Sequence, residues 1–505
     1  MIVARKAAIA VGAGQGFRCT RLSRLYTSVV LSNVPLDVSA SAACVRTNSI
    51  LQGLARLPSK KTKQSIDKTT SNAILTTKNK VYYATSAEIT RNNLSLESGH
   101  NIQLIHLPPN RSDLAQDTFG IENEDSLDDN DDHDGAKDTV SNVDLVIFDR
   151  FYVEEAHSFR FRKAFPRAAM VLDMQDMHSL RWGRQAIVEH YDKQNQQTKG
   201  WDPLACLPEV MKYLPTAEES STRESDRFLR ELASMYRSDL VLVCSPQEMH
   251  WLQSVYQVPK EKLVLASFFV EPPNKKLPDL DVANPRFVFC GGFKHAPNAD
   301  AVRILMDWVW PQIRSQLPTA TLHIYGAHCP DQLKSNRNNR RNGIFVHGFE
   351  PHLEAIFETG ILLAPLRFGA GIKGKIIDAW TFGMPVVTTP IGSEGMTMDD
   401  NGLFGGGVAS NLDSFCQTAI RLATNPDDYR KAQINGRLLL EKLYCASNNW
   451  NQVQKQLLEV MDHDVLVERR KRDYTQGMLW HQSMRSTEYF SRWVEIKEST
   501  LREKD

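Results

Sequence analysis

The chain has 505 residues, of which 42% are hydrophobic and 24% are charged, and its formal net charge is zero. A chain of this length and hydrophobic content can bury two ordinary cores, so we expect two domains. The balanced charge argues against a nucleic-acid partner, and no apolar run is long enough for a transmembrane segment. The eight cysteines have no paired spacing, which indicates reduced thiols rather than disulfides or a zinc site.

The amino-terminal segment is basic. Residues 1–36 carry five Lys and Arg side chains and no acidic residue, with Ser and Thr interspersed. This composition predicts a transit peptide, processed near residues 24–28, and hence a mitochondrial or other organellar location. A weak secretory signal in residues 7–14 and an untargeted extension, which would leave the protein cytoplasmic, are the alternatives. Residues 37–78 are rich in Ser, Thr, Lys and Asn, and we expect a disordered linker there.

A first α/β domain is predicted over residues 79–275. It is interrupted by an acidic insertion, residues 122–138, whose match to a calcium loop fails because Ser141 stands where a bidentate Glu is required. We interpret this run as a solvated insertion. Strand-like apolar runs then alternate with helical stretches, which is the pattern of a doubly wound domain. The strand candidates are residues 81–85, 102–107, 143–149, 171–176, 240–245 and 263–269.

A second α/β domain is predicted over residues 285–445, after a hinge rich in Pro, Asn and Asp. Its strands again alternate with helices. A charged helical tail, residues 446–505, follows. The strand candidates of this domain are residues 287–290, 321–325, 344–347, 361–366 and 385–389.

The segment 364–396, APLRFGAGIKGKIIDAWTFGMPVVTTPIGSEGM, is the most informative one. A strand ends in a loop with Gly369 and Gly371, and Lys373 and Lys375 open the next helix. Glycines allow close approach of the backbone to a ligand, and the free N–H groups of a helix start attract anions. The combination predicts a diphosphate site, and an ordinary turn with solvated lysines is the alternative.

This segment resembles the donor-binding segment of family 4 glycosyltransferases, which are retaining enzymes of the GT-B fold. The resemblance implies two Rossmann-like domains facing a cleft, with the last helices crossing back onto the first domain. It assigns Lys373 and Lys375 to the diphosphate and Asp378 to the ribose of a nucleotide-sugar. Two positions depart from the usual pattern, because Asp378 replaces a Glu and Ala370 stands where another Glu is common.

Two further loops resemble donor-side segments of the same enzymes. Gly291 and Gly292 follow the first strand of the second domain and would approach the donor. Lys294 is a candidate phosphate ligand, with an ordinary surface lysine as the alternative. Glu394 would accept a hydrogen bond from a sugar hydroxyl, whereas helix capping by Ser393 is the competing interpretation of that loop.

The first domain supplies the other candidate residues. Residues 150–155 and 172–181 follow strand ends and resemble segments of bacterial glycosyltransferases that carry the same glycine loop. By this resemblance His178 contacts the transferred sugar, and Asp176 orients His178 or binds an acceptor hydroxyl. The alternative is that Asp173 or Asp176 caps the following helix.

Together these features imply a glycosyltransferase that moves a hexose-type sugar from a nucleotide-diphospho-sugar to a hydroxyl acceptor, with retention of configuration. Its catalytic residues would be His178, Asp176 and Lys373, and neither a metal nor a cofactor is expected. The alternative is a GT-B-shaped nucleotide-sugar or glycan-binding protein without turnover. It rests on Asp378, on Ala370 and on the absence of a recognisable glycine-bearing strand–turn–helix before residue 144.

Overall fold

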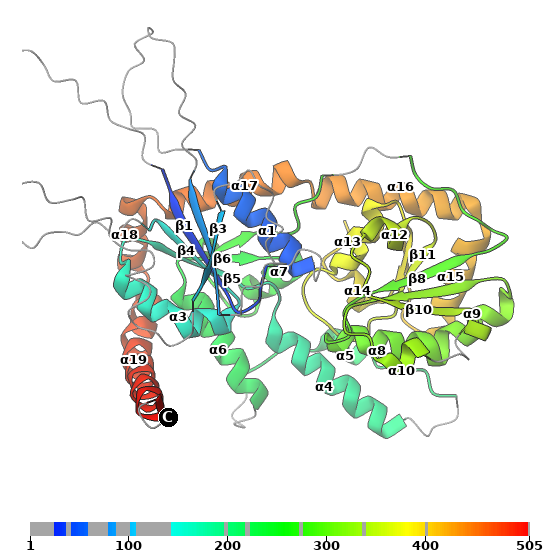
Figure 1. The fold of residues 1–505 in the computed structure, drawn as a ribbon, viewed down its shortest axis with the longest axis horizontal. Helices are drawn as coiled ribbons and strands as arrows, with labels where there is room; N and C mark the ends of the chain where they lie inside the picture. Colours follow the sequence, from blue (N-terminus) through cyan, green and yellow to red (C-terminus); the bar gives the residue numbers. More distant parts are fainter. Residues whose placement is uncertain are drawn as a thin grey trace, which may run out of the picture.

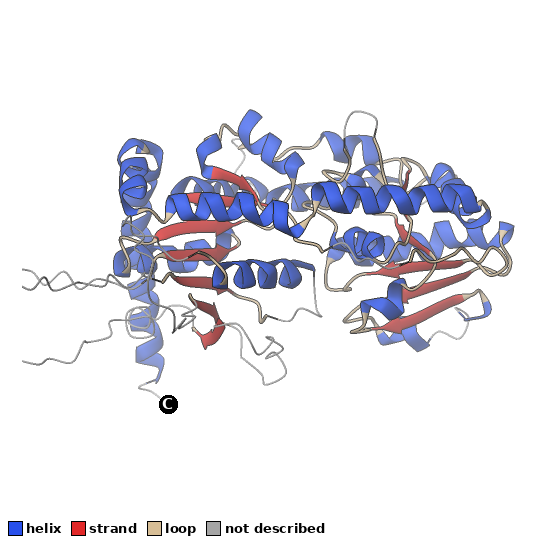
Figure 2. Ribbon diagram, turned by 90° about the horizontal axis from the view of Figure 1, so that it is seen from above, coloured by secondary structure: helices blue, strands red, loops and turns tan. Residues whose placement is uncertain are grey.

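The computed structural model contains two parallel β-sheets, each covered by helices (Figures 1 and 2). We call the part built on the first sheet the first domain and the part built on the second sheet the second domain. This architecture confirms the predicted two-domain α/β fold. The described residues are 25–36, 42–58, 79–86, 102–107, 143–195, 200–217, 223–271, 276–335, 340–398 and 402–502.

The first sheet has the strand order β3-β2-β1-β4-β5-β6-β7, with all neighbours parallel. Its central strands are apolar because helices cover both faces of a parallel sheet. The order reverses between β1 and β4, and ligands of doubly wound folds bind beyond the carboxyl ends of strands at such a point. The strands are β1 Thr27–Ser32, β2 Lys80–Thr85, β3 Ile102–His106, β4 Leu145–Asp149, β5 Ala169–Asp173, β6 Leu240–Val243 and β7 Leu263–Leu265. The helices are α1 Ala42–Ala55, α3 Phe151–Ala164, α4 His178–Asn195, α5 Leu207–Lys212, α6 Arg223–Arg237 and α7 Pro246–Ser254.

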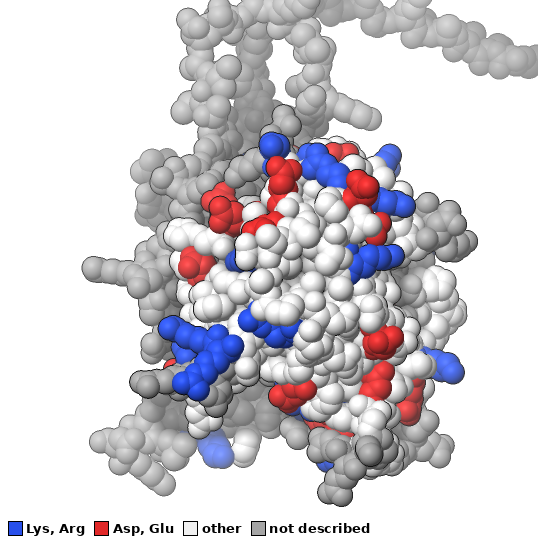
Figure 3. All heavy atoms as spheres, turned by 90° about the vertical axis from the view of Figure 1, so that its right-hand side faces the viewer, with Lys and Arg blue, Asp and Glu red and all other residues white. Residues whose placement is uncertain are grey.

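The second sheet has the order β10-β9-β8-β11-β12-β13, also parallel, and its order reverses between β8 and β11. The strands are β8 Arg286–Cys290, β9 Thr321–Tyr325, β10 Ile344–Gly348, β11 Ile361–Ala364, β12 Val386–Thr388 and β13 Gly406–Val408. The helices are α8 Ala296–Ile304, α9 Trp310–Gln316, α10 Asp331–Ser335, α12 Leu353–Phe357, α13 Gly374–Thr381, α14 Pro390–Ser393, α15 Leu412–Thr424 and α16 Pro426–Leu443. On the outer face of this domain, acidic and basic side chains are interspersed (Figure 3).

The amino-terminal boundaries predicted from the sequence are wrong. β1 lies inside the segment predicted as a transit peptide, yet it pairs with both β2 and β4. α1 lies inside the predicted linker, and its Leu51 and Leu54 are buried in the first-domain core. The family that this chain resembles usually has a glycine in the turn after the first strand. The segment between β1 and α1 has no glycine, so this strand and helix could not be recognised from the sequence. Residues 1–24, residues 59–78 and the acidic insertion lie outside the described residues.

The boundary between the domains is also not a single point in the sequence. The second half of α4 and the segment through α5 pack into the core of the second domain, where Val188 and Leu207 join Phe287. Arg367 of the second domain is buried and donates hydrogen bonds of 2.6 and 2.8 Å to Asp192 of α4. A first domain that extends without interruption to residue 275 is therefore wrong for this segment, because these residues bury their apolar side chains against the second sheet.

The carboxyl-terminal helices cross back onto the first domain, as predicted. After α16 the chain forms α17 Ala446–Val460, α18 His463–Arg472 and α19 Tyr474–Arg502, and α17 runs along the first sheet (Figure 1). Val453 and Leu457 of α17 are buried in the first-domain core, and Arg470 of α18 donates hydrogen bonds of 2.6 and 2.9 Å to Asp239. Among the described helices, none combines the length and apolarity that crossing a bilayer demands.

Candidate active site

The glycine loop, residues 369–371, connects β11 with α13. Gly369 and Gly371 have φ angles of 154° and 66°, in the region where a side chain is strained, so glycine is needed at both positions. Lys373 is the N-cap residue of α13. Its Nζ atom is buried and donates a hydrogen bond of 2.7 Å to the carbonyl of Gly371. The local sequence therefore forms the predicted arrangement, with a buried cation at a helix start.

Lys375, one residue into α13, faces the loop that follows β8. Its Nζ atom donates a hydrogen bond of 2.5 Å to Oδ1 of Asn298 and lies 4.4 Å from the centroid of the Phe289 ring. A Cβ atom at Gly291 would be only 2.7 Å from this Nζ atom, so a larger residue there would displace the lysine. The predicted residues Gly291 and Lys375 are thus brought together, and Asn298 joins them.

Lys375 and Asp378 lie on α13 and are partly buried, whereas Gly292 and Lys294 lie in the loop after β8. Burial lowers the pKa of Lys375 to about 8, although Cys290 and Asp378 oppose this shift. Burial raises the pKa of Asp378, on the same helix, to about 7, and Lys375 opposes that shift. A Cβ atom at Gly292 would meet no atom within 4 Å, so its surroundings do not require glycine. Lys294 is exposed, and its place in the site stays a prediction.

The first-domain side of the site is the turn between β5 and α4. The Nε2 atom of His178 lies 3.4 Å from Oδ1 of Asp176, and its ring stacks on Trp182 with centroids 5.7 Å apart. The first N–H groups of α4, those of His178 and Ser179, donate to the carboxylate of Glu231 at 2.8 and 3.0 Å. Glu231 therefore caps α4, and the alternative that Asp173 or Asp176 has this role is wrong.

Asp176 is strongly acidic. Burial alone would raise its pKa, but Arg181, His178 and His295 together with Arg150 outweigh this effect and hold the pKa at about 2. A carboxylate with such a pKa is a poor proton acceptor at neutral pH, which favours a role in orienting His178. His295 belongs to the second domain, and sequence reasoning did not identify it.

The two sides meet at the glycine loop. A Cβ atom at Gly371 would lie 2.8 Å from Cβ of Asp176, so glycine is needed there for close approach as well as for its φ angle. Arg184 of α4 donates a hydrogen bond of 3.0 Å to the carbonyl of Gly369. The glycine loop, which precedes Lys373, therefore contacts the His178 turn directly, so candidate residues from both domains lie side by side.

Glu394 has a partner that the sequence did not reveal. Both of its carboxylate oxygens accept hydrogen bonds from Arg184, at 2.7 and 2.8 Å, and both side chains are buried. The N-cap of α14 is Thr389, whose side chain accepts from the N–H of Gly392, so capping of that helix by Ser393 is wrong. The hydroxyl contact predicted for Glu394 stays a prediction, and in this structure its carboxylate joins the two domains.

Buried charges surround Lys373. Burial lowers its pKa, Glu394 and Glu248 oppose this shift, and Arg184 adds to it. Burial also raises the pKa of Glu248 to about 8, and nearby Asp176 acts in the same direction. Among the described residues, no group of three or more His, Cys, Asp or Glu side chains is placed to hold a metal ion.

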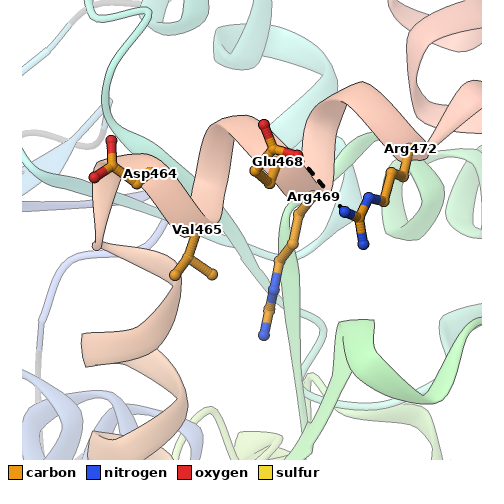
Figure 4. Close-up of a pocket in the computed structure, with 5 residues that line it drawn as sticks. All are labelled: Asp464, Val465, Glu468, Arg469 and Arg472. Atoms are coloured by element: carbon orange, nitrogen blue, oxygen red, sulfur yellow. Dashed lines mark ion pairs between the residues drawn. The ribbon is translucent and has the colours of Figure 1, made fainter. Parts of the chain in front are cut away.

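A hollow of about 420 Å³ lies elsewhere, along α18. The described residues that line it all belong to that helix, and Glu468 and Arg472 form an ion pair of 3.7 Å (Figure 4). None of these described lining residues belongs to the loops of the candidate site. The hollow therefore adds nothing to the site described above.

Replacing Arg184 by Met should lower the free energy of unfolding by about 3–5 kcal/mol, because Glu394 would keep a buried charge without its partner. Urea unfolding followed by tryptophan fluorescence measures this. Arg421→Met is the control, since that side chain is 61% exposed and lies 3.5 Å from Asp428, and its effect should stay below about 0.5 kcal/mol. The double variant Arg184→Met/Glu394→Gln should be more stable than Arg184→Met alone. If Arg184→Met and the double variant were equally stable, the loss of stability would not come from the unpaired Glu394 side chain.

The sequence and the fold were compared with those of known proteins. Residues 284–425 match the family model described as Glycosyl transferases group 1. No curated protein matches the sequence. Among solved structures, sucrose-phosphate synthase from Thermosynechococcus elongatus is similar with a TM-score of 0.54 and 13% identity, covering 86% of this chain and 99% of that one.

Two further similar structures hold ligands. HepE from Anabaena, in complex with UDP and glucose, has a TM-score of 0.52 and 11% identity, covering 86% of this chain and 100% of that chain. The pneumococcal O-GlcNAc transferase GtfA, in complex with UDP and GlcNAc, has a TM-score of 0.51 and 11% identity, covering 87% and 99%. At these identities the likeness establishes the GT-B fold alone.

Proposed function

Since residues 284–425 match the family model of glycosyl transferases group 1, we propose that the protein transfers a sugar from a nucleotide-diphospho-sugar to a hydroxyl acceptor. The observation that carries this proposal is the position of Lys373. It sits at the start of α13 on a loop that touches the His178 turn of the other domain. A diphosphate at this helix start would lie beside the residues that handle the acceptor.

The positively charged groups at the start of α13 suit the negative charge that this reaction creates. The bond between the anomeric carbon and the diphosphate oxygen breaks, and a bond from that carbon to the acceptor oxygen forms as the acceptor hydroxyl passes its proton to an oxygen of the leaving diphosphate. Negative charge then develops on the leaving nucleoside diphosphate. Lys373, Lys375 and the N–H groups at the start of α13 would stabilise that charge, without a metal ion in this proposal. Asp378 would bind the ribose hydroxyls.

The first domain would bind the transferred sugar and the acceptor. His178 is buried beside Asp176 and stacks on an aromatic ring, which fixes its orientation. We propose that His178 contacts a hexose-type sugar, that Asp176 orients it, and that the sugar is transferred with retention of configuration. UDP in the complexes of HepE and GtfA favours a uridine nucleotide as the first donor to test.

A panel of sugar nucleotides tests this proposal. The purified chain should show a higher melting temperature with one series among UDP-, GDP- and ADP-sugars, because a ligand that binds only the folded state stabilises it by mass action. Release of the nucleoside diphosphate in the presence of hydroxyl acceptors then measures turnover, and NMR of the product reports the anomeric configuration.

The outcomes separate the two candidate functions. A melting shift with turnover supports the transferase. A melting shift without turnover, across glycan, lipid and protein acceptors, supports the alternative of a nucleotide-sugar-binding protein. No shift from a folded protein would contradict the donor site itself.

A further inference from the structure

Glu248 connects the two domains at the centre of the candidate site. It lies in the first turn of α7, belongs to the first domain and is 1% exposed. Its Oε1 atom accepts a hydrogen bond of 2.6 Å from the N–H of Gly371, in the glycine loop of the second domain. Its Oε2 atom accepts one of 3.2 Å from the N–H of Met177, next to His178. One carboxylate thus holds one backbone group from each side of the site.

The surroundings show that this contact is part of a fitted interface. Ser245, the N-cap residue of α7, accepts a hydrogen bond from the N–H of Glu248, which fixes the start of the helix. A Cβ atom at Gly395 would lie 2.7 Å from the hydroxyl oxygen of Ser245. Ala370 packs against the first-domain core. The glycine loop is therefore enclosed by the first domain on the side where Glu248 lies.

A carboxyl group is unusual next to a loop expected to bind an anion, and burial, which raises the pKa of Glu248, disfavours its charged form. Both oxygens of Glu248 are occupied by N–H donors of buried backbone, and such donors are costly to leave without a partner. Lys373 is bonded to the carbonyl of Gly371, the residue whose N–H Glu248 holds. Glu248 thus holds the peptide group that precedes the Cα atom of Gly371, and Lys373 is bonded to the peptide group that follows it.

We propose that Glu248 is a positioning residue of the donor site, which fixes the glycine loop and thereby the ammonium group of Lys373 against the His178 turn. This inference rests on the proposed function, since it assigns to Glu248 the ordering of a diphosphate-binding loop. The ligand concerned is the diphosphate part of the donor. Binding of the nucleoside part would not depend on Glu248, because the residue proposed to bind the ribose, Asp378, lies further along α13.

The test compares two ligands of the same base. In Glu248→Ala, affinity for the nucleoside diphosphate that binds the wild-type protein should fall about tenfold by calorimetry, while affinity for the nucleoside alone stays unchanged. Glu248→Gln keeps a carbonyl acceptor for Gly371 and should retain affinity within about threefold. Glu189→Ala is the control, because Glu189 is exposed on α4. Should Glu248→Ala fail to fold, Glu248→Asp carries the test, since its reach is one methylene shorter.

A double-mutant cycle makes the test specific to Lys373. If Glu248 acts through the loop that places this lysine, Lys373→Ala/Glu248→Ala should bind the diphosphate no more weakly than Lys373→Ala alone. Fully additive losses, an equal loss of nucleoside affinity, or unchanged diphosphate affinity in Glu248→Ala would each overturn the inference. A wild-type protein that binds no nucleoside diphosphate would instead overturn the proposed function, and this inference with it.

Discussion

Replacing Lys373 by Ala is expected to weaken the binding of the donor diphosphate by about 100-fold, because a charge-assisted contact to the phosphate oxygens is lost. The side chain is buried at the start of α13, and its Nζ atom is held by the carbonyl of Gly371. It is therefore ordered before the ligand arrives, and little freedom is lost on binding. Calorimetric titration with the sugar nucleotide identified in the panel measures the loss.

Lys431→Ala is a matched control for this prediction, since Lys431 is exposed on α16 and its removal should leave the affinity unchanged. The melting temperature without ligand has to be recorded for both variants, because removal of a buried lysine also changes the balance of charge around Glu394 and Glu248. A folded Lys373→Ala protein with wild-type affinity would show that the diphosphate binds elsewhere.

Replacing Val30 by Asp is expected to prevent folding of the first domain. Val30 lies in β1, an interior strand of the first sheet that pairs with β2 and β4, and is 2% exposed. An unpaired carboxylate there has no partner among the surrounding apolar side chains, and its burial costs more than most domains can tolerate. Circular dichroism and thermal melting of the purified chain measure the effect.

The control for this second prediction is Val45→Asp on α1, where the same change is made at a side chain that is 41% exposed. This variant should melt close to the wild-type temperature. If Val30→Asp folded as well as Val45→Asp, β1 would not be a part of the first core. The segment up to residue 36 could then be removed, as a transit peptide of that length requires.

The sequence by itself determined the features of the site that are local. The glycines at positions 369 and 371, the helix that begins after Lys373, and the alternation of strands and helices are readable from residues close in the chain. Local backbone preferences and hydrophobic runs are readable without tertiary contacts. For this reason the second domain and its glycine loop could be predicted, whereas the GT-B fold was expected from the resemblance of this loop to family 4 glycosyltransferases.

β1 could not be predicted in this way. It is six residues long, follows a basic segment and precedes a loop without glycine, so no local signal distinguishes it from a leader. Pairing with β2 and β4 makes it a strand, and those strands lie about 50 and 120 residues further along the chain. The packing of α5 on the second domain could not be predicted either, because it also depends on contacts between residues far apart in the chain.

Only the tertiary structure decided which charged groups share the site. Glu248 is 123 positions from Gly371, and Arg184 is 210 positions from Glu394. Sequence patterns report periodicity and capping over a few residues, whereas these pairs depend on how two sheets are placed against each other. A buried carboxylate is stable only where donors meet it, and for Glu248 and Glu394 some of those donors come from the other domain, so their roles exist in the folded molecule and nowhere in the local sequence.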